Sequence, residues 1–269
     1  MIRFRGQSMC SFALVLSLMS LTPPSGARAA FVNWLQVAGC AKVIAANEGA
    51  FLNIWAIGRG GGDQQVYQWD QSVGWLPHPF VWANRIALPE TQSGGLPWVV
   101  DASGRIFAFD GSTWLAKPGC ARELVFDADK QTVWVIGCTR VGSDYSIHRL
   151  RPGSSQWERM PSSATGIGRM SNFIAITNSA GKLSVWNDNA RRFEQQSLPS
   201  GFNRAELRGT STAILTNTSP ARREIWQWVV TGWARQSPNT PNADVIWSTR
   251  DFAVNGNCQI FFREHNDAS

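Results

Sequence analysis

The sequence repeats itself, and this repetition limits the fold more than any other feature. An aromatic residue recurs six times at spacings of 36 to 43 residues: Trp34, Trp75, Trp114, Trp157, Phe193 and Trp233. After each one come a polar or Pro/Gly-rich stretch and then three short apolar segments separated by turn-forming residues. A unit of about 40 residues that recurs in this way indicates an architecture in which each unit packs on its neighbours.

The apolar segments of each unit are predicted to be β-strands. They are short, rich in β-branched and aromatic residues, and bounded by turn formers, as at 101–104 and 178–181. The next aromatic then begins a fourth strand, and beyond the N-terminal segment no stretch has a helical period. Four strands per unit, repeated six times, predict an all-β, six-bladed β-propeller with four-stranded blades. The alternative is an unrelated β-sandwich with accidental regularity.

The two ends of the repeat complement each other. The last unit stops after 260–263 without its own aromatic strand, whereas the Trp34 strand has no unit before it. We therefore expect residues 31–37 to supply the outer strand of the blade formed by 243–263. Such a closure would hide two sheet edges that otherwise invite aggregation.

The N-terminus has the features of a secretory signal over residues 1–29. Arg3 and Arg5 precede an apolar run at 11–21, and Ala27-Arg28-Ala29 resembles a cleavage site. The apolar run is shorter than the roughly 20 residues that a membrane span needs. The sequence thus predicts a secreted or periplasmic protein with one domain over 30–269 and no membrane span in that domain.

Composition narrows the class of partner. Charged residues make up only 16% of the chain, which has 14 Trp and 14 Phe, as expected for an ordered β protein rather than a disordered one. Half of the net charge of +6 comes from three arginines of the signal. No basic cluster with interleaved aromatics is present, so nucleic acid is not an expected partner. We expect a monomer.

Four cysteines follow the signal, and an even number in an exported chain favours disulfides. Cys120 and Cys138 lie at equal distances from a turn at 127–130 and would face each other across two strands. Cys40 and Cys258 would then join the first unit to the last, although four cysteines allow three pairings. No Cys-x-x-C or Cys/His pattern predicts a metal site.

The repeat resembles that of the tectonin family of propellers, which includes fish-egg lectins. The resemblance covers about 31–263. It is clearest in the first unit and at the beginning of the third, at the following residues: Trp34, Gly39, Ala41, Ile44, Trp55, Tyr67, Trp69, Trp114, Gly119, Ala121 and Trp134. Units four to six depart from the pattern, for example with Phe193 in place of the opening Trp. The resemblance implies a six-bladed ring, often with a carbohydrate-binding role, and leaves the ligand open.

A sugar site needs aromatic faces with polar groups beside them. Strand alternation places Tyr67 and Trp69 on one face, and Trp226 and Trp228 repeat this arrangement. Trp82 and Trp247 have no counterpart in the other units. The candidate ligand-binding residues are Trp69, Trp82, Trp226, Trp228, Trp247, Asp70 and Arg149. The alternative is that these Trp side chains only fill space between blades.

An enzyme is the rival class, since propellers also include sialidases and lactonases. His78, His148 and His265 occupy different positions of the repeat, and no convergent acid, base or metal ligands stand out. We therefore predict no catalytic residues, metal or cofactor. The expected function is that of a lectin-like binding protein for glycans or lipopolysaccharide. The alternatives are an interaction scaffold for an envelope or extracellular protein and, less favoured, a propeller hydrolase.

Overall fold

The computed structural model describes residues 33–46, 53–59, 64–89, 95–127, 129–170, 172–207, 209–210, 212–218, 221–229, 232–235, 245–248, 252–255 and 257–264. Every regular element in these residues is a β-strand, so the all-β prediction is confirmed. None of the described residues belongs to a helix long and apolar enough to cross a membrane. The predicted signal at 1–29 lies outside the described residues, and Val32–Ser269 form one compact unit.

The strands form five hydrogen-bonded sheets. One has seven strands, in the order β22 (Val245–Ser248), β23 (Phe252–Asn255), β24 (Gln259–Glu264), β1 (Asn33–Ala46), β2 (Ile54–Gly58), β3 (Gln64–Asp70) and β4 (Gly74–Ala83). The next has β5 (Arg85–Ala87), β6 (Trp98–Val100), β7 (Ile106–Phe109) and β8 (Trp114–Lys117). A third has β12 (Glu158–Ala164), β11 (Asp144–Leu150), β10 (Thr132–Val141) and β9 (Ala121–Asp127).

The two remaining sheets follow later in the chain. One has β16 (Arg192–Gln195), β15 (Leu183–Asn187), β14 (Phe173–Thr177), β13 (Gly166–Met170) and the two-residue β18 (Gly209–Thr210). The other has β17 (Arg204–Leu207), β19 (Thr212–Thr218), β20 (Ala221–Val229) and β21 (Gly232–Arg235). Apart from the short parallel contact of β18 with β13, the paired strands in all five sheets are antiparallel.

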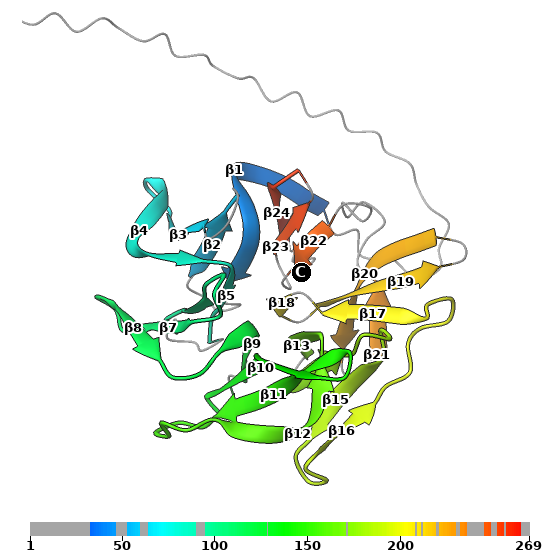
Figure 1. Cartoon of the computed structure of the whole chain (residues 1–269). Coiled ribbons are helices and arrows are strands. Elements are labelled where there is room, and N and C mark those ends of the chain that lie inside the picture. The colour runs from blue at the N-terminus through cyan, green and yellow to red at the C-terminus, as the bar shows by residue number, and fades with distance from the viewer. Residues whose placement is uncertain are drawn as a thin grey trace, which may run out of the picture. The chain divides into compact units, whose positions relative to one another are not determined.

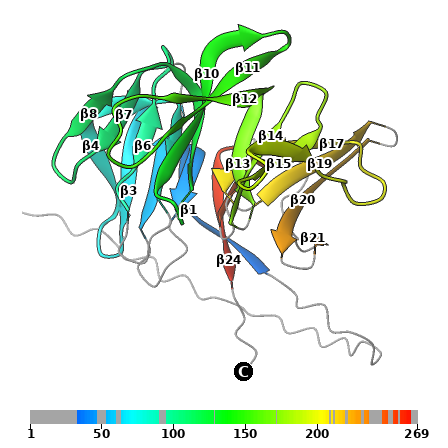
Figure 2. The same cartoon turned by 90° about the horizontal axis from the view of Figure 1, so that it is seen from below.

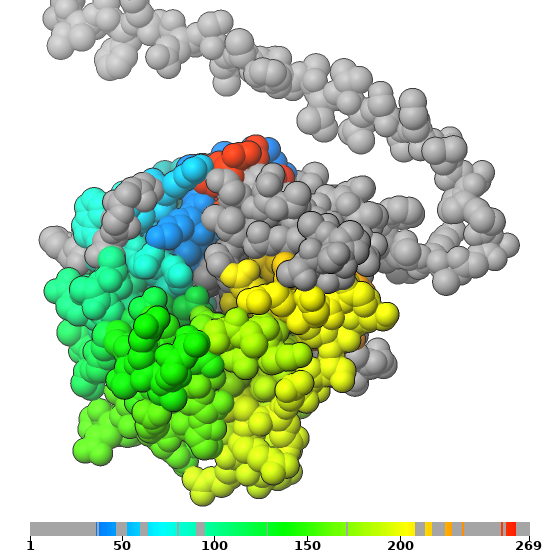
Figure 3. Space-filling view, turned by 45° about the vertical axis from the view of Figure 1, so that its right-hand side comes forward, coloured from blue at the N-terminus to red at the C-terminus, as the bar shows by residue number. Residues whose placement is uncertain are grey.

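The sheets stand around a common centre, as the blades of a β-propeller do (Figure 1). The view from below shows β1 and β24 side by side, in agreement with their pairing (Figure 2). In the space-filling view, the green sheets β9–β16 and the yellow β17 form a continuous packed surface (Figure 3).

The prediction of six separate blades is wrong, because the six sequence units occupy five sheets. The first part of β1 pairs with β24, from Asn33↔Glu264 to Val37↔Ile260, and its second part pairs with β2. The chain does not break between them, since Gly39 (φ 127°) bends the strand without ending it. The first and last units therefore merge into one sheet. The predicted pairing of the N-terminal strand with the last unit is confirmed.

Aromatic side chains fill the space between adjacent sheets. Trp55 of β2 is 1% exposed and packs edge-on against Phe109 and Trp114 of the next sheet. Trp134 of β10 packs in the same way against Trp186 of the sheet that follows. Rings of this size bury large apolar areas, so these contacts are a main source of stability. They also show that several of the repeated Trp residues are structural.

Candidate functional site

A backbone latch recurs where the turn between two strands meets the inner strand of the next unit. The carbonyl oxygens of Gly104, Gly181 and Cys258 accept hydrogen bonds of 2.9 Å from Ala121, Ala205 and Ala41 respectively. All three turn residues have positive φ, between 65° and 88°. Cys258 thus occupies a position that glycine fills elsewhere in the repeat.

Both predicted disulfides are present. Cys258 forms one with Cys40, across 218 residues of sequence, and Cys120 forms the other with Cys138, across 18 residues. The first crosslinks the turn before β24 to the bend in β1, beside the latch. Disulfides of this kind belong to proteins of oxidising compartments.

An open cavity of about 470 Å³ lies beside the Cys40–Cys258 disulfide, and we refer to it as the aromatic cleft. Its ring-bearing side chains are Tyr67 of β3 and Trp75 and Trp82 of β4. Its polar side chains come from the end of β2 and the start of β3: Arg59, Gln64 and Gln65. The cleft therefore combines three aromatic rings with two amides and one cation.

Two glycines let the rings lie directly on the backbone of the cleft. A Cβ atom at Gly39 would come within 2.7 Å of Nε1 of Trp75, and one at Gly58 within 3.1 Å of Cε2 of Tyr67. The Trp75 indole N–H donates a 3.0 Å hydrogen bond to the Ala38 carbonyl oxygen, which fixes the ring. The wall of the cleft is thus preformed.

Trp82 reaches the cleft because β4 pairs with β3 irregularly. Val66 lies opposite His78, whereas the preceding Gln65 lies opposite Trp82, so residues 79–81 are extra on the β4 side. The Trp82 side chain remains 57% exposed, which is high for a residue of this size. The Gln65 amide nitrogen donates to the carbonyl oxygens of Val66 and His78, which holds the side chain at this irregularity.

Two of the other predicted site residues have structural roles nearby. Trp69 packs edge-on against Trp75 at 5.1 Å between ring centroids, and so supports a wall of the cleft. Asp70 accepts hydrogen bonds from the backbone N–H groups of Ser72 and Val73 and from the Ser72 hydroxyl, which lower its pKa. Its carboxylate therefore fixes the turn between β3 and β4.

The same turn recurs after β7. Asp110 accepts from the backbone of Ser112 and Thr113, and these bonds, with that from the Ser112 hydroxyl, lower its pKa to about 2. An Asp-x-Ser sequence at this point of the repeat is therefore a turn signal.

The remaining predicted residues lie elsewhere. Trp226 packs against Phe202 and donates its indole N–H to Glu224. Trp228 and Trp247 are on β20 and β22, and their side chains fall outside the described part of the structure. Arg149 lines a different groove, so the structure does not bring it together with Trp82. Of the seven candidates, Trp82 alone is among the residues that line the aromatic cleft as described.

The repeat pattern does not single out Tyr67, Trp75, Gln64, Gln65 or Arg59 as ligand-facing residues. Tyr67 and Trp75 occupy repeat positions that also have structural uses. The three extra residues before Trp82 could be recognised in the sequence, because they break the spacing of the repeat unit at this edge.

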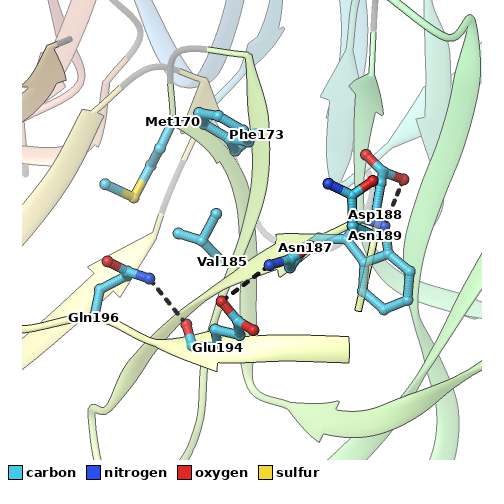
Figure 4. A pocket seen from close by; sticks show the side chains of 9 residues that line it. Met170, Phe173, Val185, Asn187, Asp188, Asn189, Glu194 and Gln196 are labelled. Carbon is cyan, nitrogen blue, oxygen red and sulfur yellow. Dashed lines mark hydrogen bonds between the residues drawn. The ribbon is translucent and has the colours of Figure 1, made fainter. Parts of the chain in front are cut away.

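A second cavity, of about 430 Å³, lies against β14–β16 (Figure 4). Met170, Phe173 and Val185 form its apolar side. Three of its polar side chains are already engaged: Asn187 donates to the Glu194 carboxylate at 3.1 Å, and Gln196 donates to the Glu194 carbonyl oxygen at 3.2 Å. Polar groups already paired in this way have less to gain from a ligand.

Within the described residues, no group of three or more His, Cys, Asp or Glu side chains could hold a metal ion. His78 and His148 are partly buried, which lowers the pKa of each imidazole, with nearby Arg159 lowering that of His148 further. They contact Gln68 and Ser146 respectively.

Comparison with known proteins supports the fold and leaves the function open. No protein-family model and no curated protein sequence matches the chain. Similar solved structures include a gluconolactonase from Xanthomonas campestris, with 12% identity, a TM-score of 0.55, and coverage of 87% of this chain and 90% of that chain. The Cps50 (Swd1) β-propeller domain of Myceliophteria thermophila has 10% identity, a TM-score of 0.52, and coverage of 87% and 98%.

YCF48 from Cyanidioschyzon merolae is also similar, with 12% identity, a TM-score of 0.50, and coverage of 88% and 99%. At these identities the likeness shows a β-propeller fold alone, and the fold serves an enzyme as well as other proteins. The function has to be argued from the site.

Proposed function

We propose that the chain is an exported, non-enzymatic binding protein of the tectonin-like kind, and that its aromatic cleft holds a saccharide. The observation that carries this proposal is the exposed Trp82 ring at a preformed cavity lined by Tyr67 and Trp75. Aromatic faces pack against the C–H faces of a sugar, and the polar side chains at the edge of the cleft, such as Arg59, can pair with its hydroxyl groups.

The size and geometry of the cleft fit a small ligand better than the surface of a large partner. A cavity of about 470 Å³ lies within the range of small-molecule sites, about 300–1,000 Å³. The rings of Trp75 and Tyr67 lie against glycine backbone, so little side-chain entropy would be lost when a ligand binds. The two disulfides and the signal-like residues 1–29 support export to an oxidising compartment, where glycans are accessible.

The test is a glycan array on the purified protein, followed by calorimetry with the best ligand. Trp82→Ala should weaken the affinity about tenfold, the expected effect of losing one well-packed ring contact of about 1.5 kcal/mol. The matched control is Phe173→Ala, which removes a 50% exposed ring from the other cavity and should change the affinity less than about twofold.

Wild-type affinity in Trp82→Ala would place the ligand outside the aromatic cleft. An array without any binder, together with a specific protein recovered from an envelope or extracellular extract, would favour the interaction scaffold instead. Turnover of a lactone or glycoside by the purified protein would overturn the non-enzymatic part of the proposal.

A further inference from the structure

A groove of about 480 Å³ lies between the sheets β9–β12 and β13–β16, apart from the aromatic cleft. Four cations line it, Lys130, Arg149, Arg151 and Arg191, with one carboxylate, Asp188. It lies at the start of β10 and the ends of β11 and β15, whereas the aromatic cleft lies at the end of β2 and the start of β3. Because the strands are antiparallel, these are opposite ends of the sheets.

Arg149 is the fixed element of this groove. It is 7% exposed, and its guanidinium carbon lies 5.1 Å from the ring centroid of Trp134 and 5.7 Å from that of Trp186. Its Nε and one terminal nitrogen both donate to the same oxygen of Glu158, at 3.3 and 2.8 Å. A guanidinium held by two rings and a carboxylate is pre-organised, and its second terminal nitrogen has no described partner.

The charges around Arg149 favour an anion. Glu158 also contacts Arg151 at 3.0 Å and Arg191 at 3.8 Å, so one carboxylate serves three guanidinium groups. Hydrogen bonds from Arg149 are the main cause of the lowered pKa of Glu158. One negative charge cannot neutralise three positive ones, and the side chains of Arg151 and Arg191 remain 57% and 73% exposed.

Lys130 and Asp188 complete the rim. Lys130 pairs with both Asp188 and Asp127. Burial alone would lower the pKa of Lys130, but these carboxylates raise it overall, so the amine stays charged. Asp188 also accepts from the Trp186 indole N–H, so its carboxylate is already engaged. The four cations of the groove pair with three carboxylates in all, those of Asp188, Glu158 and Asp127. This leaves an excess of one positive charge.

We propose that this groove is an oxyanion-binding site, in which Arg149, Arg151 and Arg191 hold a carboxylate, sulfate or phosphate group of a ligand. Guanidinium groups bind such oxyanions with paired, charge-assisted hydrogen bonds. The site is separate from the aromatic cleft and does not depend on the saccharide proposal.

The experiment titrates the purified full chain with sodium sulfate, sodium phosphate and sodium acetate, at constant ionic strength set with sodium chloride. Intrinsic fluorescence reports binding, because Trp134 and Trp186 flank Arg149. At least one anion should bind more tightly than chloride. The double variant Arg151→Gln with Arg191→Gln should weaken that binding about tenfold or more, through loss of charge-assisted hydrogen bonds.

Two controls make the result specific. Lys182→Gln removes an exposed cation in the turn between β14 and β15, outside the lining of the groove, and should change the affinity less than about twofold. Trp82→Ala should leave anion binding unchanged. Arg149→Lys keeps the charge but loses the planar fork, so it should also weaken binding, with circular dichroism to confirm the fold.

The three anions separate the ligand classes. Binding of sulfate or phosphate but not of acetate would identify a tetrahedral oxyanion as the recognised group. Binding of acetate alone would identify a carboxylate. Either result supports the site. The proposal is overturned if no anion exceeds chloride, or if Lys182→Gln weakens binding as much as the double arginine variant.

Discussion

The cavity beside β1–β4 has a counterpart beside β9–β12, and the two differ in the disulfide beside them and in their lining residues. Gly39 and Trp75 correspond to Gly119 and Trp157, whose indole N–H likewise donates to a backbone carbonyl, that of Pro118, at 2.6 Å. In the first cavity Cys40, which follows the glycine, bonds to Cys258 of the last unit, whereas Cys120 bonds to Cys138 of its own unit.

The two cavities also differ in volume and in lining. Cys138 takes the place that Arg59 has in the first unit, so the disulfide sulfurs line the second cavity, which measures about 200 Å³ against about 470 Å³. His148 stands in the place of Tyr67, and no counterpart of Trp82 lines the smaller cavity. A repeated scaffold thus gives one larger cleft lined by three rings and one smaller cavity lined by both cysteines of a disulfide.

The largest expected effect is a difference in stability between variants that lack one disulfide or the other. In the chain-entropy model, a crosslink across 218 residues contributes about 5 kcal/mol to the free energy of unfolding, and one across 18 residues about 3 kcal/mol. Replacing Cys40 and Cys258 by Ser should therefore cost about 2 kcal/mol more than replacing Cys120 and Cys138. Urea unfolding of both double variants measures this, and equal losses would contradict the loop-length account.

The two glycines give the next effect. Both Gly39→Ala and Gly119→Ala place a Cβ within 3 Å of an indole nitrogen at positive φ, so each should lower the free energy of unfolding by about 1–3 kcal/mol. Only Gly39→Ala displaces a ring of the proposed saccharide site. Calorimetry with the glycan chosen on the array should show weaker binding for that variant and near wild-type binding for Gly119→Ala; the reverse order would place the site in the other cavity.

The smallest expected effect is a loss of stability at acidic pH. Burial lowers the pKa of His78 and of His148 below the ordinary value of 6.5. The unfolded chain therefore binds protons that the folded chain does not, so stability is complete above about pH 6.5 and falls as the pH drops below it. Unfolding in urea at pH 7.5 and 5.5 measures this loss. His148→Tyr, which copies the residue of the open cleft, should make the loss smaller; an unchanged loss would show that His148 takes no part.

The sequence predicts much of the fold because the repeat places side chains in register. Aligned positions indicate the strands, and the same register pairs Cys120 with Cys138 and leaves Cys40 for Cys258. The count of sheets was not predictable in this way. It depends on whether β1 ends or bends at Gly39, and that is decided by the backbone angle and by partners on both sides.

The candidate site was predicted only in part. Trp82 could be found because it falls outside the repeat, where no structural role is expected of it. Asp70 looked like a ligand for sugar hydroxyl groups, although the recurrence of Asp-x-Ser at 110–112 indicates a turn. Tyr67 and Trp75 could not be told from structural aromatics, because they occupy repeat positions that hold rings in other units as well, such as Phe107 and Trp157.

The pairing of β1 with β24 also sets an order of events for the nascent chain. Residues 33–37 find their partner only in residues 260–264, so the strand formed first waits for almost the last one. Contacts so far apart in sequence form slowly, and an unpaired strand edge is exposed until they do. Ring closure thus follows synthesis of the whole repeat. A chain exported in unfolded form would therefore close its ring only after it had crossed the membrane.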